Sequence, residues 1–146
     1  MPSPSQAPTK KKVSPETIAM ILLGEGASEG VEGLQFIRDV MFNRSQKTGK
    51  SLEEIATQPK QFSAYSRPDL GEFFSRQPPI LQQLARELVL EAQQKDFTPK
   101  YPDITNYTTT AFYENRDTLP KSHWIHAMEP AFTVGHHTAL RPRSRK

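Results

Sequence analysis

Glutamates in a glycine-rich segment are the residues of this chain best suited to do chemistry. Glu25 falls on the apolar stripe of a predicted helix, between Gly24 and Gly26. Burial and the negative end of a helix both disfavour an ionised carboxylate, so Glu25 is predicted to be a neutral acid near pH 7. Such an acid can protonate the leaving oxygen of a glycosidic bond, and the flanking glycines would let a bulky polymer approach. The same pattern also fits a glutamate that faces solvent at a helix end.

A second carboxylate could complement Glu25. If Ser28 caps the following helix, Glu29 lies in its first turn, where the positive helix end favours an ionised carboxylate. The pKa values of Glu25 and Glu29 would then be displaced in opposite directions, which is the pattern that assigns acid and base roles. We therefore predict Glu25 and Glu29 as the catalytic residues. Alternatively, Glu29 and Glu32 only stabilise the helix start, and for Glu32 we prefer that interpretation.

Polar and aromatic residues further along could bind a substrate. The predicted binding residues are Gln61, Phe62, Ser63, Tyr65, Thr105, Tyr107, Thr109, Tyr113 and His137. The first four lie in a loop rich in helix breakers, where binding residues are common. On a strand, Thr105, Tyr107 and Thr109 would share one face and present hydroxyl groups. Alternatives remain open: Phe62 and Tyr65 could pack in the core, and the threonine-rich face could simply be solvated.

Histidine and tryptophan could also take part in a site. His123 and His126 are close in sequence, but adjacent His136 and His137 would point apart on a strand, and no defined zinc spacing is present. We therefore predict no metal site and no cofactor. His137 could also serve as a polar packing residue. Trp124, the only tryptophan, could stack on a sugar or cover the core, and we favour the core.

Helical periodicity predicts the elements that position these residues. Helices are predicted from a Ser14 cap to about residue 25, at 28–44, at 52–57 behind a Ser51–Glu54 capping box, and at 79–95. Residues 58–79 are predicted to be irregular, and 103–113 and 131–138 to be extended. The predicted fold class is α+β and mainly α, with several helices around a core and a small irregular β element.

Length and composition limit the classes of protein. A chain of 146 residues fits one domain, predicted at 14–140, between a flexible arm rich in proline and lysine at 1–13 and a basic tail at 141–146. The absence of cysteine excludes disulfides and thiolate metal sites. No signal peptide is visible, and the apolar run at 18–23 is too short to cross a bilayer. The net charge of +3 is concentrated at the two ends, where it would attract polyanions or stay solvated. The basic residues are not interleaved with aromatic residues, so we predict no nucleic-acid partner, although a nucleic-acid-binding domain remains an alternative.

Five segments resemble, in order, the SleB-like cell-wall hydrolase family. They are Gly24–Gly33, with its three glutamates, Asn43–Arg44, Gln61–Ser63, Ala111–Asn115 and Thr133–His137. Together they extend over residues 13–137. The resemblance implies a lysozyme-like catalytic domain that cuts peptidoglycan at the β-1,4 bond between N-acetylmuramic acid and N-acetylglucosamine.

The resemblance also implies the mechanism and the setting. One essential glutamate, here Glu25, would serve as general acid and base of a lytic transglycosylase, which needs no carboxylate nucleophile. The expected partner is the glycan strand. Without a signal peptide, an endolysin or virion-associated lysin of a bacteriophage is expected, located in the host cytoplasm or in the virion among phage proteins. The alternative is a non-catalytic wall-binding or virion structural protein on the same fold.

Overall fold

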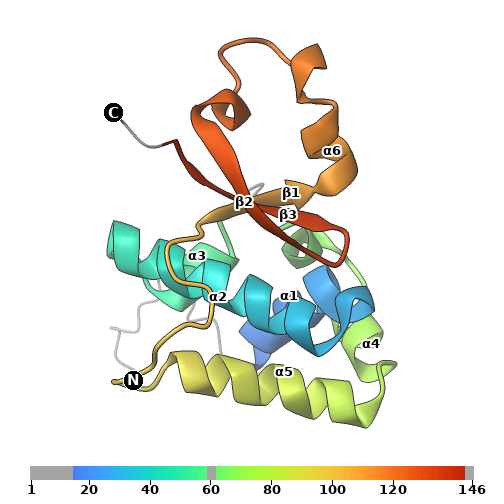
Figure 1. The fold of residues 1–146 in the computed structure, drawn as a ribbon. Coiled ribbons are helices and arrows are strands. Elements are labelled where there is room, and N and C mark those ends of the chain that lie inside the picture. The colour runs from blue at the N-terminus through green and yellow to red at the C-terminus, as the bar shows by residue number, and fades with distance from the viewer. Residues whose placement is uncertain (1–14, 59–61, 144–146) are drawn as a thin grey trace, which may run out of the picture.

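A computed structural model describes residues 15–58 and 62–143 of the chain (Figure 1). The helices are α1 (Pro15–Gly26), α2 (Gly30–Thr48), α3 (Leu52–Ala56), α4 (Leu70–Ser75), α5 (Pro79–Ala92) and α6 (Thr110–Glu114). Short 3-10 helices are η2 (Ala27–Glu29), η3 (Ser63–Ser66), η4 (Arg116–Thr118) and η5 (Trp124–Ala127). The strands are β1 (Asn106–Thr109), β2 (Met128–Val134) and β3 (His137–Pro142). The chain is therefore mainly helical with a small antiparallel sheet, which confirms the predicted class at this level.

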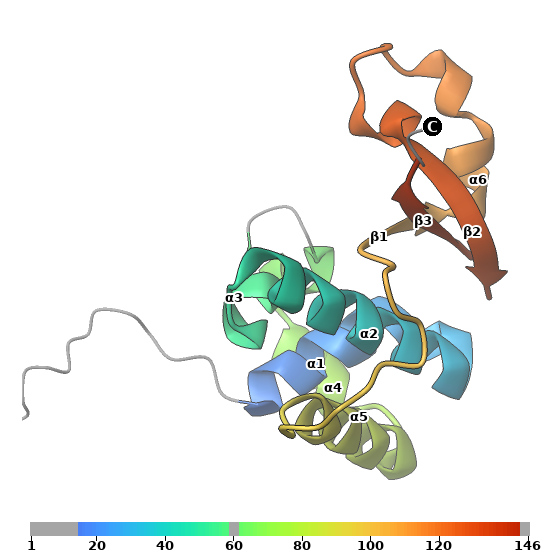
Figure 2. The ribbon, with the colours of Figure 1, turned by 60° about the vertical axis from the view of Figure 1, so that its left-hand side comes forward.

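Helix α1 is the central element of the helical part. It contacts α2, α3, α4 and α5, which surround it in both ribbon views (Figures 1 and 2). Its apolar residues from Ile18 to Leu23 are almost all fully buried. A helix that is apolar all round must be covered on all sides, so the surrounding helices hold the end of α1 that carries Glu25.

A buried ion pair joins α2 to its neighbours. Arg38 Nε lies 2.8 Å from Asp39 Oδ1, and the same guanidinium donates to the carbonyl of Leu88 on α5 at 3.0 Å. Asp39 Oδ2 accepts a hydrogen bond of 2.9 Å from the backbone N–H of Tyr101. Because both charges find partners, the burial is tolerated and fixes the segment that leads into β1.

The sheet has the strand order β1–β3–β2, and both strand pairs are antiparallel. Phe36 of α2 meets the ring of Tyr107 at 5.5 Å and that of Phe132 at 5.9 Å, so one sheet face packs on the helices. Ala139 of β3 joins this main core, whereas the next residue, Leu140, joins a small second core on the opposite face. Residues 110–127 cover that second face (Figure 1).

Several predicted boundaries are wrong. Ser28 does not cap the second helix, because it lies within η2; α2 begins at Gly30, and its N-cap position is Glu29, without a side-chain cap. This helix also continues past Arg44 to Thr48, where Gly49 in a left-handed conformation ends it. Helix α3 has the predicted capping box, and α5 ends at Ala92, before the predicted residue 95.

The irregular and extended predictions need larger corrections. Residues 58–79 contain α4, which the breakers Pro68 and Gly71 concealed. Only Asn106–Thr109 of the segment 103–113 forms a strand, because the Thr109 side chain caps α6. The second extended segment is a hairpin, in which β2 and β3 turn at Gly135 (φ 58°) and His136.

The chain ends outside the predicted domain are described only in part. The predicted arm at 1–13, the Ser14 cap and residues 144–146 lie outside the described residues. Arg141 and Pro142 belong to β3, so the sheet extends past the predicted domain end at residue 140. Within residues 15–58 and 62–143, no helix has the length and apolar character needed to span a bilayer.

Candidate functional site

Three segments that are far apart in sequence meet at the carboxyl group of Glu25. Its Oε2 accepts a hydrogen bond of 2.7 Å from the backbone N–H of Ala64 and a longer one of 3.5 Å from the Ser63 hydroxyl. Its Oε1 lies 3.5 Å from the hydroxyl of Tyr107 on β1. Glu25 is only partly buried. The carboxyl group is therefore fixed by α1, η3 and β1 and still reaches the surface.

The glycines beside Glu25 allow close packing of protein against α1. A Cβ atom at Gly24 would lie 2.7 Å from that of Ala64, and one at Gly26 would lie 2.8 Å from Ile37 Cδ1. The prediction that α1 ends here is confirmed. The glycines, however, make room for η3 and α2, whereas the sequence suggested room for a polymer. The small size of Gly24 brings the Ala64 amide within reach of Glu25.

Tyr107 is a neutral hydrogen-bond donor facing Glu25. Its ring packs edge-on against Phe36 at 5.5 Å and against His137 at 5.0 Å. Burial raises the pKa of Tyr107 well above its usual range, and the charge of Glu25 raises it further, while Arg44 opposes these effects. The phenol therefore keeps its proton and can donate it in a hydrogen bond to the carboxylate.

Asn43 and Arg44, near the end of α2, hold the segment that delivers Tyr107. Asn43 Nδ2 donates to the carbonyl oxygens of Tyr101 and Ile104, both at 2.9 Å. Arg44 Nε donates to the carbonyl of Thr105 at 2.6 Å, and burial lowers the pKa of its guanidinium. These three bonds set the path of the chain immediately before β1.

Glu29 contacts the β2–β3 hairpin. Its Oε1 accepts a hydrogen bond of 2.9 Å from the backbone N–H of His136 and lies 4.0 Å from His137 Nδ1. The side chain is only 5% exposed. A Cβ atom at Gly135 would lie 1.7 Å from Glu29 Oε1, so only glycine admits this carboxylate beneath the turn. The predicted place of Glu29 in the first turn of α2 is therefore wrong, because the hairpin amide takes its carboxylate.

Glu32 lies in the first turn of α2, the position expected of a residue that stabilises the start of the helix. Its Oε2 accepts a hydrogen bond of 2.7 Å from the Tyr101 hydroxyl. Burial raises the pKa of Tyr101, and the hydrogen bond to Glu32 raises it further. Glu32 thus joins α2 to the segment before β1, away from the contacts of Glu25.

A pocket of about 370 Å³ opens beside Glu25. It is lined by Gly24, Glu25, Ala27, Ser28, Arg67, Phe73 and Gln77. The guanidinium of Arg67 lies 4.2 Å from the centre of the Phe73 ring and its Nε is 2.5 Å from Asp69 Oδ1. The pocket lining therefore combines an acid with an aromatic ring and a guanidinium that is paired with Asp69.

Sequence reasoning missed the wall formed by Arg67, Phe73 and Gln77. All three lie in the stretch that was predicted to be irregular. The helical spacing of Leu70, Phe73 and Phe74 is the signal that could have located it, since i, i+3, i+4 spacing marks one helix face.

The remaining predicted binding residues have different surroundings. Ser63 contacts Glu25 directly, and His137 contacts both Tyr107 and Glu29. Phe62 is buried in the core under the Arg44 guanidinium, which answers the open alternative in favour of packing. Tyr65 is exposed on η3. Gln61 lies outside the described residues.

The polar residues of the sheet are mostly engaged elsewhere. The Thr109 hydroxyl accepts the Phe112 N–H at 3.2 Å. The predicted strand face that includes Thr105 is wrong for that residue, because β1 begins at Asn106; the Thr105 hydroxyl donates to Asn106 Oδ1 at 2.9 Å. Tyr113 packs on the second core, with the Arg116 guanidinium 4.1 Å from its ring centre. In the described part of the chain, Tyr107 is the one predicted binding residue of β1 with a hydrogen bond to Glu25.

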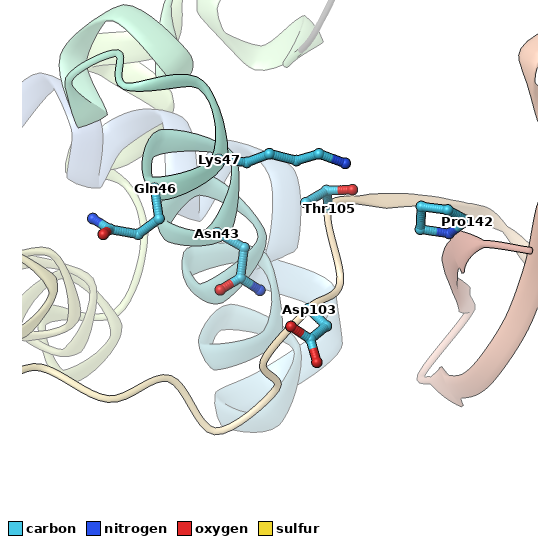
Figure 3. Close-up of a pocket in the computed structure, with 6 residues that line it drawn as sticks. All are labelled: Asn43, Gln46, Lys47, Asp103, Thr105 and Pro142. Carbon is cyan, nitrogen blue, oxygen red and sulfur yellow. The ribbon is translucent and has the colours of Figure 1, made fainter. Parts of the chain in front are cut away.

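A larger pocket, of about 460 Å³, lies between α2 and the sheet (Figure 3). Lys47 extends across it toward Thr105 and Pro142, whereas Gln46 points away. Asn43 also lines it, but its amide nitrogen is already bonded to two backbone carbonyls. No predicted catalytic residue lines this space, so the pocket beside Glu25 is the candidate site.

The histidines and Trp124 complete the list of candidates. Nδ1 of His123 accepts the backbone N–H of Ile125 at 3.1 Å. In the described part of the chain, no three His, Cys, Asp or Glu residues form a group that could hold a metal ion. Trp124 is 46% exposed, so the interpretation of Trp124 as a core residue is wrong.

The chain matches no protein-family model, and comparisons with curated proteins and with solved structures gave no significant match. The geometry of the site is therefore the basis of the function proposed for it.

Proposed function

We propose that this protein cleaves the glycan strands of bacterial peptidoglycan, with Glu25 as the proton donor. The observation that carries the proposal is the setting of Glu25: a partly buried carboxyl group at the end of the central helix, lining a pocket and held at both oxygens. Directional contacts of this kind orient an acid toward a bound substrate. In this proposal the bond cut is the β-1,4 bond between N-acetylmuramic acid and N-acetylglucosamine.

The proposed reaction uses Glu25 twice. The protonated carboxyl group gives its proton to the leaving glycosidic oxygen as the bond to C1 breaks. The resulting carboxylate then takes the proton of the muramyl 6-hydroxyl while that oxygen bonds to C1, which leaves a 1,6-anhydro end. The Ala64 amide and the Tyr107 hydroxyl would stabilise the carboxylate between the two steps.

The contacts of Glu29 favour this route over a two-carboxylate hydrolysis. A retaining glycosidase needs a second carboxylate free to attack the sugar. Glu29 is buried and accepts the His136 amide, so we assign it a positioning role: it holds the hairpin, and through His137 the ring of Tyr107, beside Glu25. This replaces its predicted catalytic role in our proposal.

We also propose that the fold is lysozyme-like. The sequence resemblance led us to expect several helices around a core and a small β element, and the protein has a helical part that carries the acid at the end of its first helix and a small three-stranded antiparallel sheet. Its supporting observation is that helix and sheet both contact the carboxyl group of Glu25.

Digestion of purified peptidoglycan by wild type and Glu25→Gln tests the proposal. We expect soluble fragments with 1,6-anhydromuramic ends, identified by mass spectrometry, and a loss of about 10²- to 10⁴-fold in rate for Glu25→Gln. The glutamine retains an oxygen for the Ala64 amide, so thermal unfolding should change little. Glu32→Gln is the matched control, because Glu32 lies in the same segment and outside the pocket.

The outcomes separate the candidate functions. Equal activity of wild type and Glu25→Gln would contradict Glu25 as the acid. Sedimentation with cell walls without any released fragment would instead support the non-catalytic wall-binding alternative. Reducing ends in place of anhydro ends would retain the enzyme and overturn the transglycosylase route.

A further inference from the structure

A row of aromatic rings lies on the far side of the sheet from the helices, with Phe112 and Trp124 exposed and His123 half-buried. The ring centres of Phe112 and His123 are 6.1 Å apart, and those of His123 and Trp124 are 5.4 Å apart. Phe112 is 42% exposed and Trp124 is 46% exposed. The three residues come from α6 and from the start of η5. We call this row the aromatic platform.

The platform is held in place by short, capped elements. The Thr109 hydroxyl accepts the Phe112 N–H at the start of α6, and His123 Nδ1 accepts the Ile125 N–H at the start of η5. Ile125 itself is fully buried in the second core. The backbone contacts thus hold two exposed rings and the half-buried His123 beside one another, with the plane of His123 tilted by 53° from that of Phe112 and by 32° from that of Trp124.

The chemistry of the platform fits a sugar polymer. Two large hydrophobic residues are exposed within residues 110–127, Phe112 and Trp124, and both are aromatic. No leucine, isoleucine or valine is exposed in this segment. A flat aromatic face suits the C–H face of a pyranose ring, and a polar tip beside it suits the hydroxyl rim. His123 supplies that tip, because its Nε2 is the ring nitrogen left for a partner once Nδ1 is bonded.

A chain of neighbouring residues connects the pocket beside Glu25 to the platform. Ser28 lines the pocket beside Glu25, and the next residue, Glu29, binds the amide of His136. Gly135 and His136 in turn line a second pocket, of about 390 Å³, together with Thr109, Thr110 and Ala111. Phe112 follows directly. Both ribbon views place the β2–β3 turn close to the junction of α1 and α2 (Figures 1 and 2).

We propose that Phe112, His123 and Trp124 form a distal glycan-binding site. Their rings stack against pyranose rings of the same glycan strand that is cleaved at Glu25. The threonine-lined pocket at the hairpin turn takes the sugars between the two places. This inference rests on the proposed function for the identity of the polymer, but binding at the platform requires no turnover.

Trp124 reports on the platform because it is the only tryptophan of the chain. The full-length Glu25→Gln variant is titrated with oligomers of N-acetylglucosamine of increasing length while Trp124 emission is followed. We expect a saturable blue shift. Phe112→Ala should weaken binding about threefold to tenfold, because one stacked ring is lost, and Phe112→Tyr should retain it.

Matched variants distinguish binding at this site from nonspecific contact with any exposed hydrophobic residue. Leu90→Ala removes another exposed large hydrophobic residue, on α5, and should leave the affinity unchanged. Trp124→Ala, measured by calorimetry, should weaken binding as Phe112→Ala does. An equal loss of affinity in Leu90→Ala would overturn the assignment.

The two proposals fail in different ways. A wild-type enzyme that cleaves peptidoglycan, with Trp124 emission unchanged by the oligomers and unchanged kcat/KM in Phe112→Ala, would overturn the platform alone. A saturable shift of Trp124 without any fragment release would support the platform and contradict the proposed function.

Discussion

Tyr107 is the residue through which the sheet reaches the carboxyl group of Glu25. Its hydroxyl lies 3.5 Å from Oε1, the oxygen that the Ala64 amide does not occupy. Burial and the charge of Glu25 raise the pKa of Tyr107. The phenol therefore stays protonated near neutral pH and remains a hydrogen-bond donor. A neutral donor stabilises the carboxylate without adding a charge to the pocket.

Tyr107→Phe removes this donor and keeps the ring. We expect kcat/KM on peptidoglycan to fall about threefold to tenfold, the effect of losing one long hydrogen bond to a charged group. The ring contacts with Phe36 and His137 persist, so the melting temperature should change little. Activity equal to wild type would show that the hydroxyl has no part in the reaction.

At the scale of elements, Glu29 joins the start of α2 to the β2–β3 hairpin. The contact combines a buried carboxylate, the backbone N–H of His136 and the absence of a side chain at Gly135. Because η2 carries both Ser28 of the pocket and Glu29, the hairpin is joined to the pocket lining through one short element.

Substitutions at Glu29 and Gly135 test this junction. Gly135→Ala adds a Cβ atom that collides with Glu29 Oε1, at a residue with φ 58°, and should lower the free energy of unfolding by about 1–3 kcal/mol from strain alone. In a double-mutant cycle, Glu29→Ala should make Gly135→Ala less costly, because the collision is removed.

Two substitutions of Glu29 distinguish a positioning role from a catalytic role. Glu29→Gln still accepts the His136 amide and should retain most activity and stability, whereas Glu29→Ala should lose both. Strict additivity in the cycle, measured by urea unfolding, would contradict the contact. Loss of activity in a stable Glu29→Gln variant would restore a catalytic role for Glu29.

At the scale of the molecule, two tyrosines link folding to alkaline pH. Burial raises the pKa values of Tyr107 and Tyr101, and the contact with Glu32 raises that of Tyr101 further. Above about pH 10 the unfolded chain loses phenolic protons that the folded protein keeps. The free energy of unfolding should therefore fall as pH rises, by up to about 1.4 kcal/mol per pH unit for Tyr107 and by less for Tyr101, whose hydroxyl is more exposed to solvent.

Urea unfolding between about pH 9 and pH 11 measures this slope. Tyr107→Phe should flatten it, since phenylalanine has no proton to lose. The stability below pH 10 is unaffected by this linkage, because both states then hold the proton. A slope identical in wild type and Tyr107→Phe would show that Tyr107 titrates normally in the folded protein.

The sequence predicted elements with a strong local signal. The run around Ile21, the Ser51–Glu54 capping box and the apolar stripe beginning at Pro79 each identify a helix by nearby residues alone. Glu25 was found for the same reason, because its place on the stripe and its flanking glycines are local features.

The long-range contacts of the site could not be predicted. The groups that hold Glu25 and Glu29 are the backbone N–H groups of Ala64 and His136, 39 and 107 positions away. A backbone amide carries no residue-type signal, so no pattern marks it as a partner. The Ser28 cap failed because this tertiary contact outcompeted a local helix signal, and Trp124 was misplaced because size alone does not reveal exposure.

The strand order has a consequence for how the protein is completed during synthesis. β1, which carries Tyr107, has β3 as its neighbour in the sheet, and β3 is the last of the three strands to leave the ribosome. Helices α1 to α5 can assemble while β1 still waits for its hydrogen-bonding partner. A nascent chain would thus hold Glu25 with one oxygen bonded and the other unattended until residues 137–142 emerge. Under the proposed function, such a chain would lack the contribution of the Tyr107 hydroxyl, about threefold to tenfold in kcat/KM, until the sheet is complete.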